Sequence, residues 1–480
     1  MVLKVVCIFI ICIFCVHGQD VPVVSTTLGK IAGVYEESYK GKMFSAFYGI
    51  PFAKPPIGVL RFQDPQPVPP WSGVWNANST DIMCAQVMHA PEPEGGSYMG
   101  DEDCLYLNVF VPSTEIDSLK KFDVIVHIHG GGLMFGSSNS YTGPNYLMDE
   151  DVILVTMNYR LGVLGFLSTE DDIVPGNNGM KDQVLALKWI RDHVKSFGGN
   201  PDSVTLTGLS AGGASVHLHY FSPLSKGLFA RGVSFSGNAL TPWVLQDDPL
   251  RKAQLLGTYL GCPSRKTKDL VDCLKQRPTR QVVESIKIMR PWLFNPFSPL
   301  GIVVEKSGSN KFLVEHPYRL LKEGRFYDVP WITSLTSEEG LYPAADYVLK
   351  RNYLSELDKR WLELAPSVLD YNYTIPDGIK DQVSAQIKDE YLKGQPISPT
   401  TYKNLIDMMS DRLFSIPAEK AAKLQAHSTK SPVYVYYFCY TGEKLESFTV
   451  HFAKQDQDDG KYTNFLFIYI DTYYLCCRLR

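Results

Sequence analysis

The sequence predicts an α/β fold in which a central, mostly parallel sheet is flanked by helices. Apolar strand patterns alternate with helical patterns through the middle of the chain. No internal repeat, low-complexity block or long linker divides the chain. Because active sites in parallel sheets form at the carboxyl ends of strands, we look for functional residues where strands end.

Each predicted element rests on its own pattern. Asp123–Gly130 (DVIVHIHG) and Val152–Leu161 (VILVTMNYRL) are apolar runs typical of buried strands. Ser203–Ser210 (SVTLTGLS) predicts a short strand that leads directly into a helical pattern at 211–221. Met180–Phe197 predicts a helix because its apolar residues recur at helical spacing. These apolar residues are Val184, Leu187, Trp189, Ile190 and Val194.

Composition narrows the class of protein. The chain has 480 residues, 45% hydrophobic and 20% charged, which is ordinary for a globular protein. Length alone suggests about three domains, but α/β enzymes often exceed that size as one unit. Lys and Arg are scattered at a net charge of −4, so we expect no nucleic-acid partner. No CxxC or His/Cys cluster indicates a metal, and no cofactor is expected.

The first residues predict a secretory signal peptide. Lys4 is followed by an apolar run and then by Gly18, which gives cleavage after residue 18. An uncleaved membrane anchor is the alternative, but the run is shorter than the roughly 20 residues that a span needs. We therefore expect a secreted, extracellular protein with no membrane span after cleavage.

Cysteines and sequons agree with export. Seven cysteines remain after cleavage, and two close pairs stand out in an oxidising compartment. Asn78 and Asn372 each begin a glycosylation sequon, although such sequons also arise by chance. The close pairs are Cys84 with Cys104 and Cys262 with Cys273; the other three cysteines are Cys439, Cys476 and Cys477.

Gly208 to Gly212 (GLSAG) predicts an activated serine. The stretch matches G-x-S-x-G between a strand and a helix, the setting of a nucleophile elbow, with Ser210 as the nucleophile. Glycines are needed there because side chains would clash where strand and helix meet sharply. The alternative is an ordinary turn of small residues.

A second glycine motif favours acyl transfer. His129 to Gly132 (HGGG) ends a predicted strand upstream of the serine. Successive glycines let backbone N–H groups point at one spot, which suits a developing oxyanion. We expect the N–H groups of Gly131, Gly132 and Ala211 to form the oxyanion hole; a flexible glycine loop is the alternative.

With these motifs in place, the chain resembles the type-B carboxylesterases, the cholinesterase-like branch of the α/β-hydrolases, and insect esterases most of all. The resemblance implies the α/β-hydrolase fold and hydrolysis of carboxylic esters. It rests on two long signatures, FGGNPDSVTLTGLSAG (Phe197 to Gly212) and EDCLYLNVFVP (Glu102 to Pro112). Supporting stretches are GIPFAKPP (Gly49 to Pro56), Arg61-Phe62, NYRLGVLGF (Asn158 to Phe166) and GNNGMKDQ (Gly176 to Gln183).

The resemblance assigns further residues. It implies disulfides within both close cysteine pairs, Cys84–Cys104 and Cys262–Cys273. It also implies two structural ion pairs, Arg61–Glu102 and Arg160–Asp182.

The acid of the catalytic triad follows from the same resemblance. Members of the family carry an acid before a glycine downstream of the serine. Here an apolar strand precedes Glu338-Glu339-Gly340, so Glu339 matches the acid and Glu338 is its solvated neighbour. Without the family, a Glu-Glu pair would be taken for a solvated loop end.

The family's histidine is not found where it is expected. It should follow the late strand SPVYVYYFCY (Ser431 to Tyr440) in a G-x-x-H loop, but the position after Gly460 that matches it holds Thr463. His451 is near the right place, yet it lacks the preceding glycine and the following acid. The other histidines considered, which we expect to be structural, are His217, His219, His316 and His427.

The predicted organisation is a signal peptide at 1–18, a carboxylesterase domain at 19–460 and an atypical tail at 461–480. The tail suggests an altered or truncated carboxyl terminus. Its apolar stretch is too short for a membrane tail and is interrupted by Asp471. Without a base, Ser210 would lose a factor of order 10⁴ to 10⁶ in rate.

The predicted substrate is a small-molecule carboxylic ester, split through an acyl-enzyme on Ser210. No tryptophan lies between Cys84 and Cys104, which argues against choline esters, and Leu209 stands where juvenile-hormone esterases usually have Gln. A general or antennal-type insect esterase fits better. A catalytically defective isoform and a non-catalytic binding protein are the alternatives. Candidates for pocket walls, with core packing as their alternative role, are Met134, Phe135 and Trp243.

Overall fold

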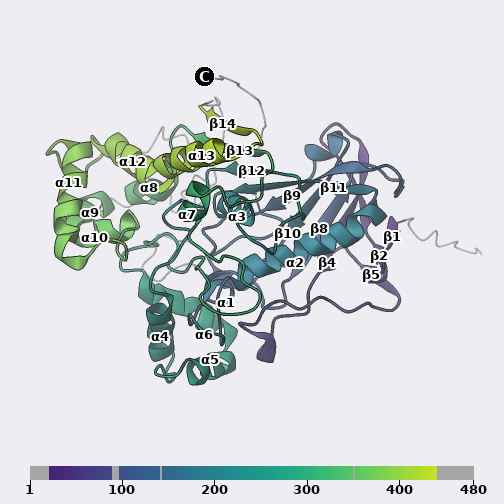
Figure 1. Ribbon diagram of the computed structural model, residues 1–480, viewed down its shortest axis with the longest axis horizontal. Coiled ribbons are helices and arrows are strands. Elements are labelled where there is room, and N and C mark those ends of the chain that lie inside the picture. The colour runs from purple at the N-terminus through teal and green to yellow at the C-terminus, as the bar shows by residue number, and fades with distance from the viewer. Residues whose placement is uncertain (1–20, 89–96, 141–142, 350–351, 440–480) are drawn as a thin grey trace, which may run out of the picture.

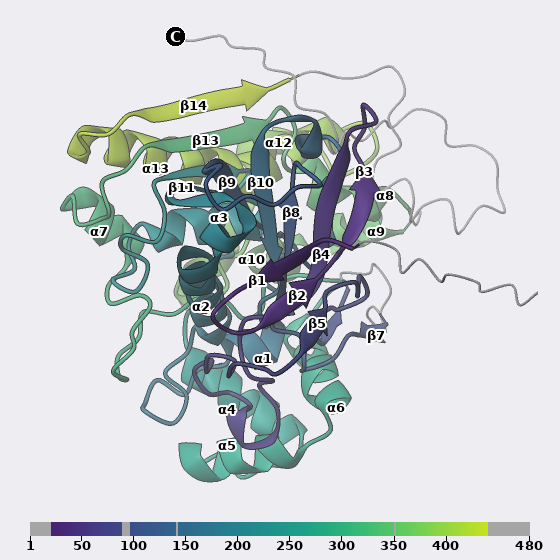
Figure 2. The same cartoon turned by 90° about the vertical axis from the view of Figure 1, so that its right-hand side faces the viewer.

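The described residues form a central sheet of nine strands that is parallel over most of its width (Figures 1 and 2). The computed structural model describes residues 21–88, 97–140, 143–349 and 352–439. The strand order is β14-β13-β12-β11-β9-β10-β8-β4-β3. Neighbours from β14 to β10 are parallel, and those from β10 to β3 are antiparallel. The strands are β3 (Val34–Glu37), β4 (Met43–Pro51), β8 (Tyr106–Val111), β9 (Phe122–Ile128), β10 (Val152–Met157), β11 (Gly199–Leu209), β12 (Arg231–Phe235), β13 (Trp331–Thr336) and β14 (Val433–Phe438).

Two smaller sheets accompany the central one. The first has the order β1-β2-β5 and the second is the pair β6-β7. Their strands are β1 (Val23–Ser25), β2 (Lys30–Ala32), β5 (Val74–Asn76), β6 (Gln86–Val87) and β7 (Tyr98–Met99). Figure 2 shows β1 and β2 in front of the central sheet, on the side away from α9 and α10.

Helices flank the sheet and extend it on one side. Figure 1 shows α9, α10 and α11 gathered at the left and α4, α5 and α6 at the bottom. A short π-helix (Asp411–Ser415) joins α12 to α13. The helices are α1 (Gly162–Phe166), α2 (Asn178–His193), α3 (Ala211–His219), α4 (Pro249–Tyr259), α5 (Thr267–Gln276), α6 (Thr279–Glu284), α7 (Pro317–Lys322), α8 (Leu341–Leu349), α9 (Tyr353–Lys359), α10 (Trp361–Val368), α11 (Lys380–Leu392), α12 (Tyr402–Ser410) and α13 (Ile416–Ser428).

The predicted mostly parallel α/β architecture is confirmed, and so are the elements that position the serine. The strand expected at 123–130 is β9, and the one expected at 203–210 is the end of the longer β11. Central strands are apolar because helices cover the sheet; Val124, Val126 and Val155, for example, are fully buried.

Two boundaries differ from the prediction. The strand expected to reach Leu161 ends at Met157, because the N–H of Arg160 is bonded to the side chain of Asp182 instead of a neighbouring strand. The helix expected at 180–197 begins at Asn178 and tightens into a 3₁₀ turn after His193. Gly198, at φ 86°, ends that turn in the left-handed conformation that glycine favours.

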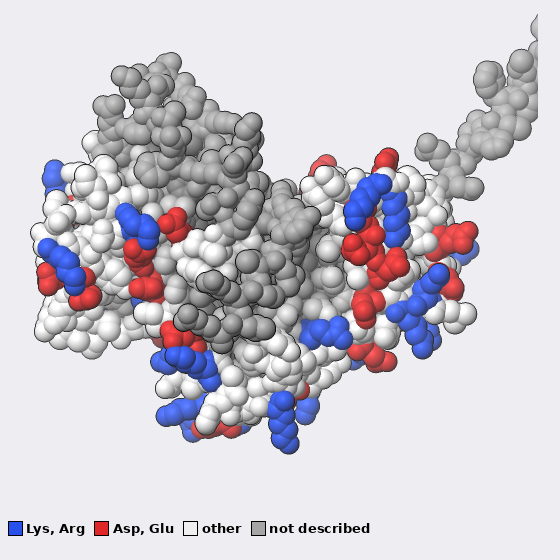
Figure 3. Space-filling view, turned by 90° about the horizontal axis from the view of Figure 1, so that it is seen from above, with Lys and Arg blue, Asp and Glu red and all other residues white. Residues whose placement is uncertain are grey.

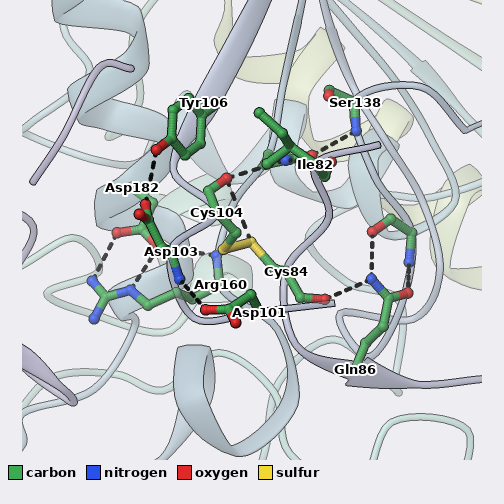
Figure 4. Close-up of a disulfide and its surroundings, with 12 residues drawn as sticks. Ile82, Cys84, Gln86, Asp101, Asp103, Cys104, Tyr106, Ser138, Arg160 and Asp182 are labelled. Carbon is green, nitrogen blue, oxygen red and sulfur yellow. Dashed lines mark hydrogen bonds and ion pairs between the residues drawn. A yellow bond between two sulfur atoms is a disulfide. The ribbon is translucent and has the colours of Figure 1, made fainter. Parts of the chain in front are cut away.

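Both disulfides implied by the family resemblance are present. The Cα atoms are 4.9 Å apart in Cys84–Cys104 and 5.7 Å apart in Cys262–Cys273. The first disulfide lies beside the side chain of Gln86, which reaches across to the loop after the HGGG motif (Figure 4).

The described residues contain neither a helix that could span a membrane nor a cluster of potential metal ligands. None of their helices is both long enough and apolar enough to cross a bilayer. In the same ranges, no group of three or more His, Cys, Asp or Glu side chains could hold a metal ion.

Candidate active site

Ser210 lies on a sharp turn between β11 and α3. Its backbone has φ 56° and ψ −118°, a conformation that costs free energy for any residue but glycine. The N–H of Ser210 donates to the carbonyl of Phe235 at 2.7 Å and so holds the turn against the end of β12. This is the geometry of a nucleophile elbow.

The flanking glycines are required by the close approach of backbone. A Cβ added at Gly208 would lie 2.3 Å from the carbonyl carbon of Gly212. A Cβ added at Gly212 would lie 2.0 Å from the carbonyl oxygen of Ile128 in β9. Neither obstacle is a side chain that could move aside, which explains why the motif has glycine at both positions.

The glycine loop after β9 lies against this turn. A Cβ on Gly130 would be 3.3 Å from the Cβ of Ser210, so the two loops are in contact. Gly131 and Gly132 have φ of 106° and 60°, the left-handed region that glycine adopts without strain. Within the described ranges, no acceptor is bonded to the N–H of either residue. Ala211 is the first residue of α3, where a helix leaves its N–H without an intrahelical partner.

Glu339 follows β13 and is buried, with 7% of its surface exposed. Its Oε1 accepts hydrogen bonds from Ser236 Oγ at 2.6 Å and from the N–H of Thr336 at 2.7 Å. Burial raises the pKa of this carboxyl to about 7, and the hydrogen bonds from Ser236 and Thr336 act in the opposite direction. Among the described residues, none donates to Oε2. The second oxygen is therefore open to another donor.

The neighbours of Glu339 differ in role. Glu338 is partly exposed, and its carboxylate lies 4.0 Å from the ammonium of Lys403. Position 340 has no room for a larger residue than glycine, since a Cβ there would lie 2.2 Å from the carbonyl oxygen of Ile406. Glu339 is thus the buried member of the pair, and Glu338 is the more solvated one.

The end of β12 joins the nucleophile turn to the acid. Phe235 accepts from the N–H of Ser210, and the next residue, Ser236, donates to Glu339. A Cβ on Gly237 would lie 2.0 Å from the carbonyl oxygen of Ser210. Sequence reasoning missed Ser236; the Ser-Gly pair directly after an apolar strand is the signal that could have found it.

Five of the described histidines are buried; His193 packs against Trp189 in α2, and the other four are hydrogen-bonded to groups other than Ser210 and Glu339. His217 is hydrogen-bonded to Gln425 and to the N–H of Ala239, and His219 is hydrogen-bonded to Ser225 and Gln183. His127 and His129 are bonded to Thr207 and to the carbonyl of Gly130. Burial lowers the pKa of His127 and His129 to about 4, and that of His217 and His219 to about 3.

The remaining histidines do not complete the triad. His316 caps α7 by accepting from the N–H of Tyr318, and His427 is exposed near the end of α13. No hydrogen bond between described residues joins an imidazole to Ser210 or Glu339. The histidines that lie outside the described residues are His17, His89 and His451.

The three candidates for pocket walls lie in the hydrophobic core. Met134 and Phe135 are each 2% exposed, and Trp243 is 1% exposed. The indole N–H of Trp243 donates to the carbonyl of Leu413 in the π-helix at 3.2 Å. Core packing, the alternative role, therefore describes these residues better than an open pocket wall.

Two buried ion pairs support the scaffold. Nε and Nη2 of Arg61 donate to the two carboxylate oxygens of Glu102 at 2.8 and 2.5 Å. Arg160 binds both oxygens of Asp182 at 2.8 and 2.7 Å (Figure 4). Both pairs implied by the resemblance are thus present, in bidentate geometry.

The asparagines of the two predicted glycosylation sequons differ in exposure. Asn78 is exposed, whereas Asn372 is partly buried and its side-chain oxygen accepts from Lys380 at 3.0 Å. On the face shown in Figure 3, acidic and basic side chains are interspersed.

A mostly parallel sheet with a serine on a strand-to-helix turn and a glycine loop beside it defines an α/β-hydrolase with the layout of a serine hydrolase. Comparison with known proteins identifies the family within this class. A model of the carboxylesterase family matches residues 20–470, and the chain belongs to this family.

Proteins similar to this chain include insect esterases. The chain is 44% identical over 427 residues to venom carboxylesterase-6 of Apis mellifera, covering 89% of this chain and 76% of the relative. It is 42% identical over 439 residues to esterase FE4 of Myzus persicae, covering 91% and 76%. The crystal structure of juvenile hormone esterase from Manduca sexta, with OTFP covalently attached, aligns at a TM-score of 0.77 and 30% identity, covering 88% of this chain and 79% of that one.

Proposed function

We propose that the protein is a secreted general or antennal-type insect esterase that hydrolyses small carboxylic esters through an acyl-enzyme on Ser210. The observation that carries the proposal is the contact between the Ser210 turn and the glycine loop. It places a strained, partly exposed serine beside backbone N–H groups that have no described acceptor.

The reaction follows from this arrangement. Ser210 Oγ attacks the ester carbonyl carbon and forms a new C–O bond, while its proton passes to a base. The negative charge on the carbonyl oxygen is stabilised by the N–H groups of Gly131, Gly132 and Ala211. The bond to the alkoxy oxygen then breaks, and the alcohol leaves with the proton. Water repeats the attack on the acyl carbon, the acid is released and Ser210 regains its hydrogen.

Glu339 is the proposed acid of the triad. Its open Oε2 is suited to accept the Nδ1–H of an imidazole and to stabilise the imidazolium that forms during attack. His451 follows β14 in the sequence and lies outside the described residues, and it lacks the glycine and the acid that flank the family's histidine.

Secretion and substrate class have separate support. The predicted leader, the two disulfides and the exposed sequon at Asn78 fit the secretory route. Venom carboxylesterase-6 and esterase FE4 support general esterase activity.

The test is covalent labelling combined with turnover. The secreted full-length protein should label with a fluorophosphonate and release a burst of chromophore from a chromogenic acetate. Ser210→Ala should do neither, while Ser234→Ala, which changes a buried serine of β12, controls for loss of folding. Labelling that persists in Ser210→Ala would overturn the assignment of the nucleophile.

A catalytically silent copy is the second candidate. It is favoured by the histidines of the described ranges, because none of them is bonded to Ser210 or Glu339. A folded wild-type protein that neither labels nor turns over would establish this alternative, or that of a binding protein on the same scaffold.

A further inference from the structure

His129 is a buried histidine that the proposed reaction does not use. It follows β9 and is 2% exposed. Its Nδ1 lies 2.8 Å from the carbonyl oxygen of Gly130, and its Nε2 is buried without a hydrogen-bond partner. Because a carbonyl oxygen can only accept, Nδ1 carries the hydrogen and Nε2 is left as a bare lone pair. Burial lowers the pKa of this histidine to about 4, which keeps the ring neutral.

The hydrogen bond from His129 fixes a peptide that belongs to the expected oxyanion hole. The carbonyl of Gly130 and the N–H of Gly131 are parts of one planar trans peptide and point in opposite directions. Whatever holds the carbonyl therefore also aims the N–H. The restraint matters here because Gly131, at φ 106°, has no side chain to limit rotation about its backbone.

The next peptide is restrained in the same way by backbone alone. The carbonyl of Gly131 accepts from the N–H groups of Met134 at 2.9 Å and Phe135 at 3.1 Å, which fixes the N–H of Gly132. The peptide between Gly130 and Gly131 differs because its carbonyl is held by a side chain.

The imidazole itself is held in place. Its ring stacks on Tyr159 with centroids 4.4 Å apart and planes 18° apart. The hydroxyl of Tyr159 donates to the carbonyl of His129 at 3.0 Å. Gly136 leaves room for the ring, since a Cβ there would lie 2.5 Å from Nδ1.

We propose that His129 is a positioning residue that aims the N–H of Gly131 at the oxyanion through its hydrogen bond to the carbonyl of Gly130. The inference rests on the proposed function of Ser210 and deepens it, because it assigns the support of one donor to a single side chain.

Three variants separate this role from packing. His129→Phe keeps a ring against Tyr159 but removes the donor, whereas His129→Asn restores a side-chain N–H that can reach the same carbonyl. His127→Phe is the matched control, because it removes a second buried imidazole two residues earlier, in β9, one bonded to Thr207 at 3.0 Å.

The readout is the affinity for a trifluoromethyl ketone set against the KM for an ester. Ser210 Oγ adds to the carbonyl carbon of the ketone and forms a hemiketal that bears an oxyanion and has no leaving group. The affinity for the ketone therefore depends on the groups that donate hydrogen bonds to the oxyanion. We expect His129→Phe to weaken ketone binding and kcat on the order of 10- to 100-fold, with KM changed by less than about 3-fold. His129→Asn should recover most of that loss, and His127→Phe should leave the ratio of ketone affinity to KM within about 3-fold of wild type.

The outcomes are distinguishable. Equal losses in His129→Phe and His127→Phe, or no recovery in His129→Asn, would overturn the inference. If the wild-type protein neither labels nor turns over, the proposed function fails instead. Crystal structures of the wild type and His129→Phe then decide: a rotated peptide between Gly130 and Gly131 in the variant supports the positioning role, and an unchanged peptide refutes it.

Discussion

Replacing Glu339 by glutamine should make the protein more stable above neutral pH while abolishing ester hydrolysis. The carboxyl is buried, and its Oε1 is bonded to Ser236 and Thr336. Glutamine presents an amide oxygen to the same two donors and carries no charge. It therefore imitates the protonated acid, the form that burial favours.

The magnitude follows from the pKa. Burial raises the pKa of Glu339 from 4.5 to about 7, so the folded protein holds this proton after the unfolded chain has released it. The contribution to stability is complete below pH 4.5 and is lost as the pH rises to about 7. At about 1.4 kcal/mol for each pKa unit, the wild type should lose about 3 kcal/mol relative to Glu339→Gln across this range.

Urea unfolding of both proteins between pH 4.5 and pH 8 measures the difference. Glu338→Gln is the matched control, because it removes the neighbouring carboxylate, which is partly exposed to water. A difference that does not change with pH would refute the calculation. A difference of opposite sign, with the wild type more stable at pH 8, would show a cationic or hydrogen-bonding group on Oε2 and would favour an intact triad.

Three further predictions concern the scaffold. Asp182→Asn should destabilise the fold by about 3–5 kcal/mol in urea unfolding, because it leaves a buried guanidinium without its counter-charge; a loss below about 1 kcal/mol would contradict this. The double variant Cys262→Ser with Cys273→Ser should lose about 3 kcal/mol in the same assay, and reduction of the wild-type bond should not exceed that loss. Gly212→Ala should abolish secretion of folded protein, since its Cβ would lie 2.0 Å from a backbone carbonyl of β9, whereas Gly378→Ala, with nothing within 4 Å, should express normally.

The sequence predicted those parts of the site whose causes are local. Gly208 is a glycine because the backbone of Gly212, four residues further along the chain, crowds it, and that crowding leaves a readable motif. The parallel strands were equally visible, because burial on both faces makes them continuous apolar runs. Only their ends were misjudged, where side chains such as Asp182 capture backbone groups from another element.

Hydrogen bonds between residues that are far apart in the sequence could not be predicted from the sequence. Ser236 bonds Glu339 from 103 residues away, and Ser298 bonds the carbonyl of Gly132 from 166 residues away. A lone serine carries no sign of so distant a partner. The burial of Met134 was also hidden, because an apolar side chain beside a glycine loop suits a pocket and a core equally well.

Two residues at the end of β12 place the nucleophile and the acid without help from a histidine. Phe235 holds the turn of Ser210 through a backbone bond, and Ser236 holds Glu339 through its hydroxyl, so nucleophile and acid are placed by the same two residues. Neither bond involves an imidazole. The strained serine, the glycine loop and the buried acid can therefore persist whether or not a histidine reaches the open oxygen of Glu339. In such a protein the loss of the base lowers the rate and leaves the ester-binding geometry intact, which is why labelling of Ser210 and the pH dependence of stability have to be measured on the same preparation.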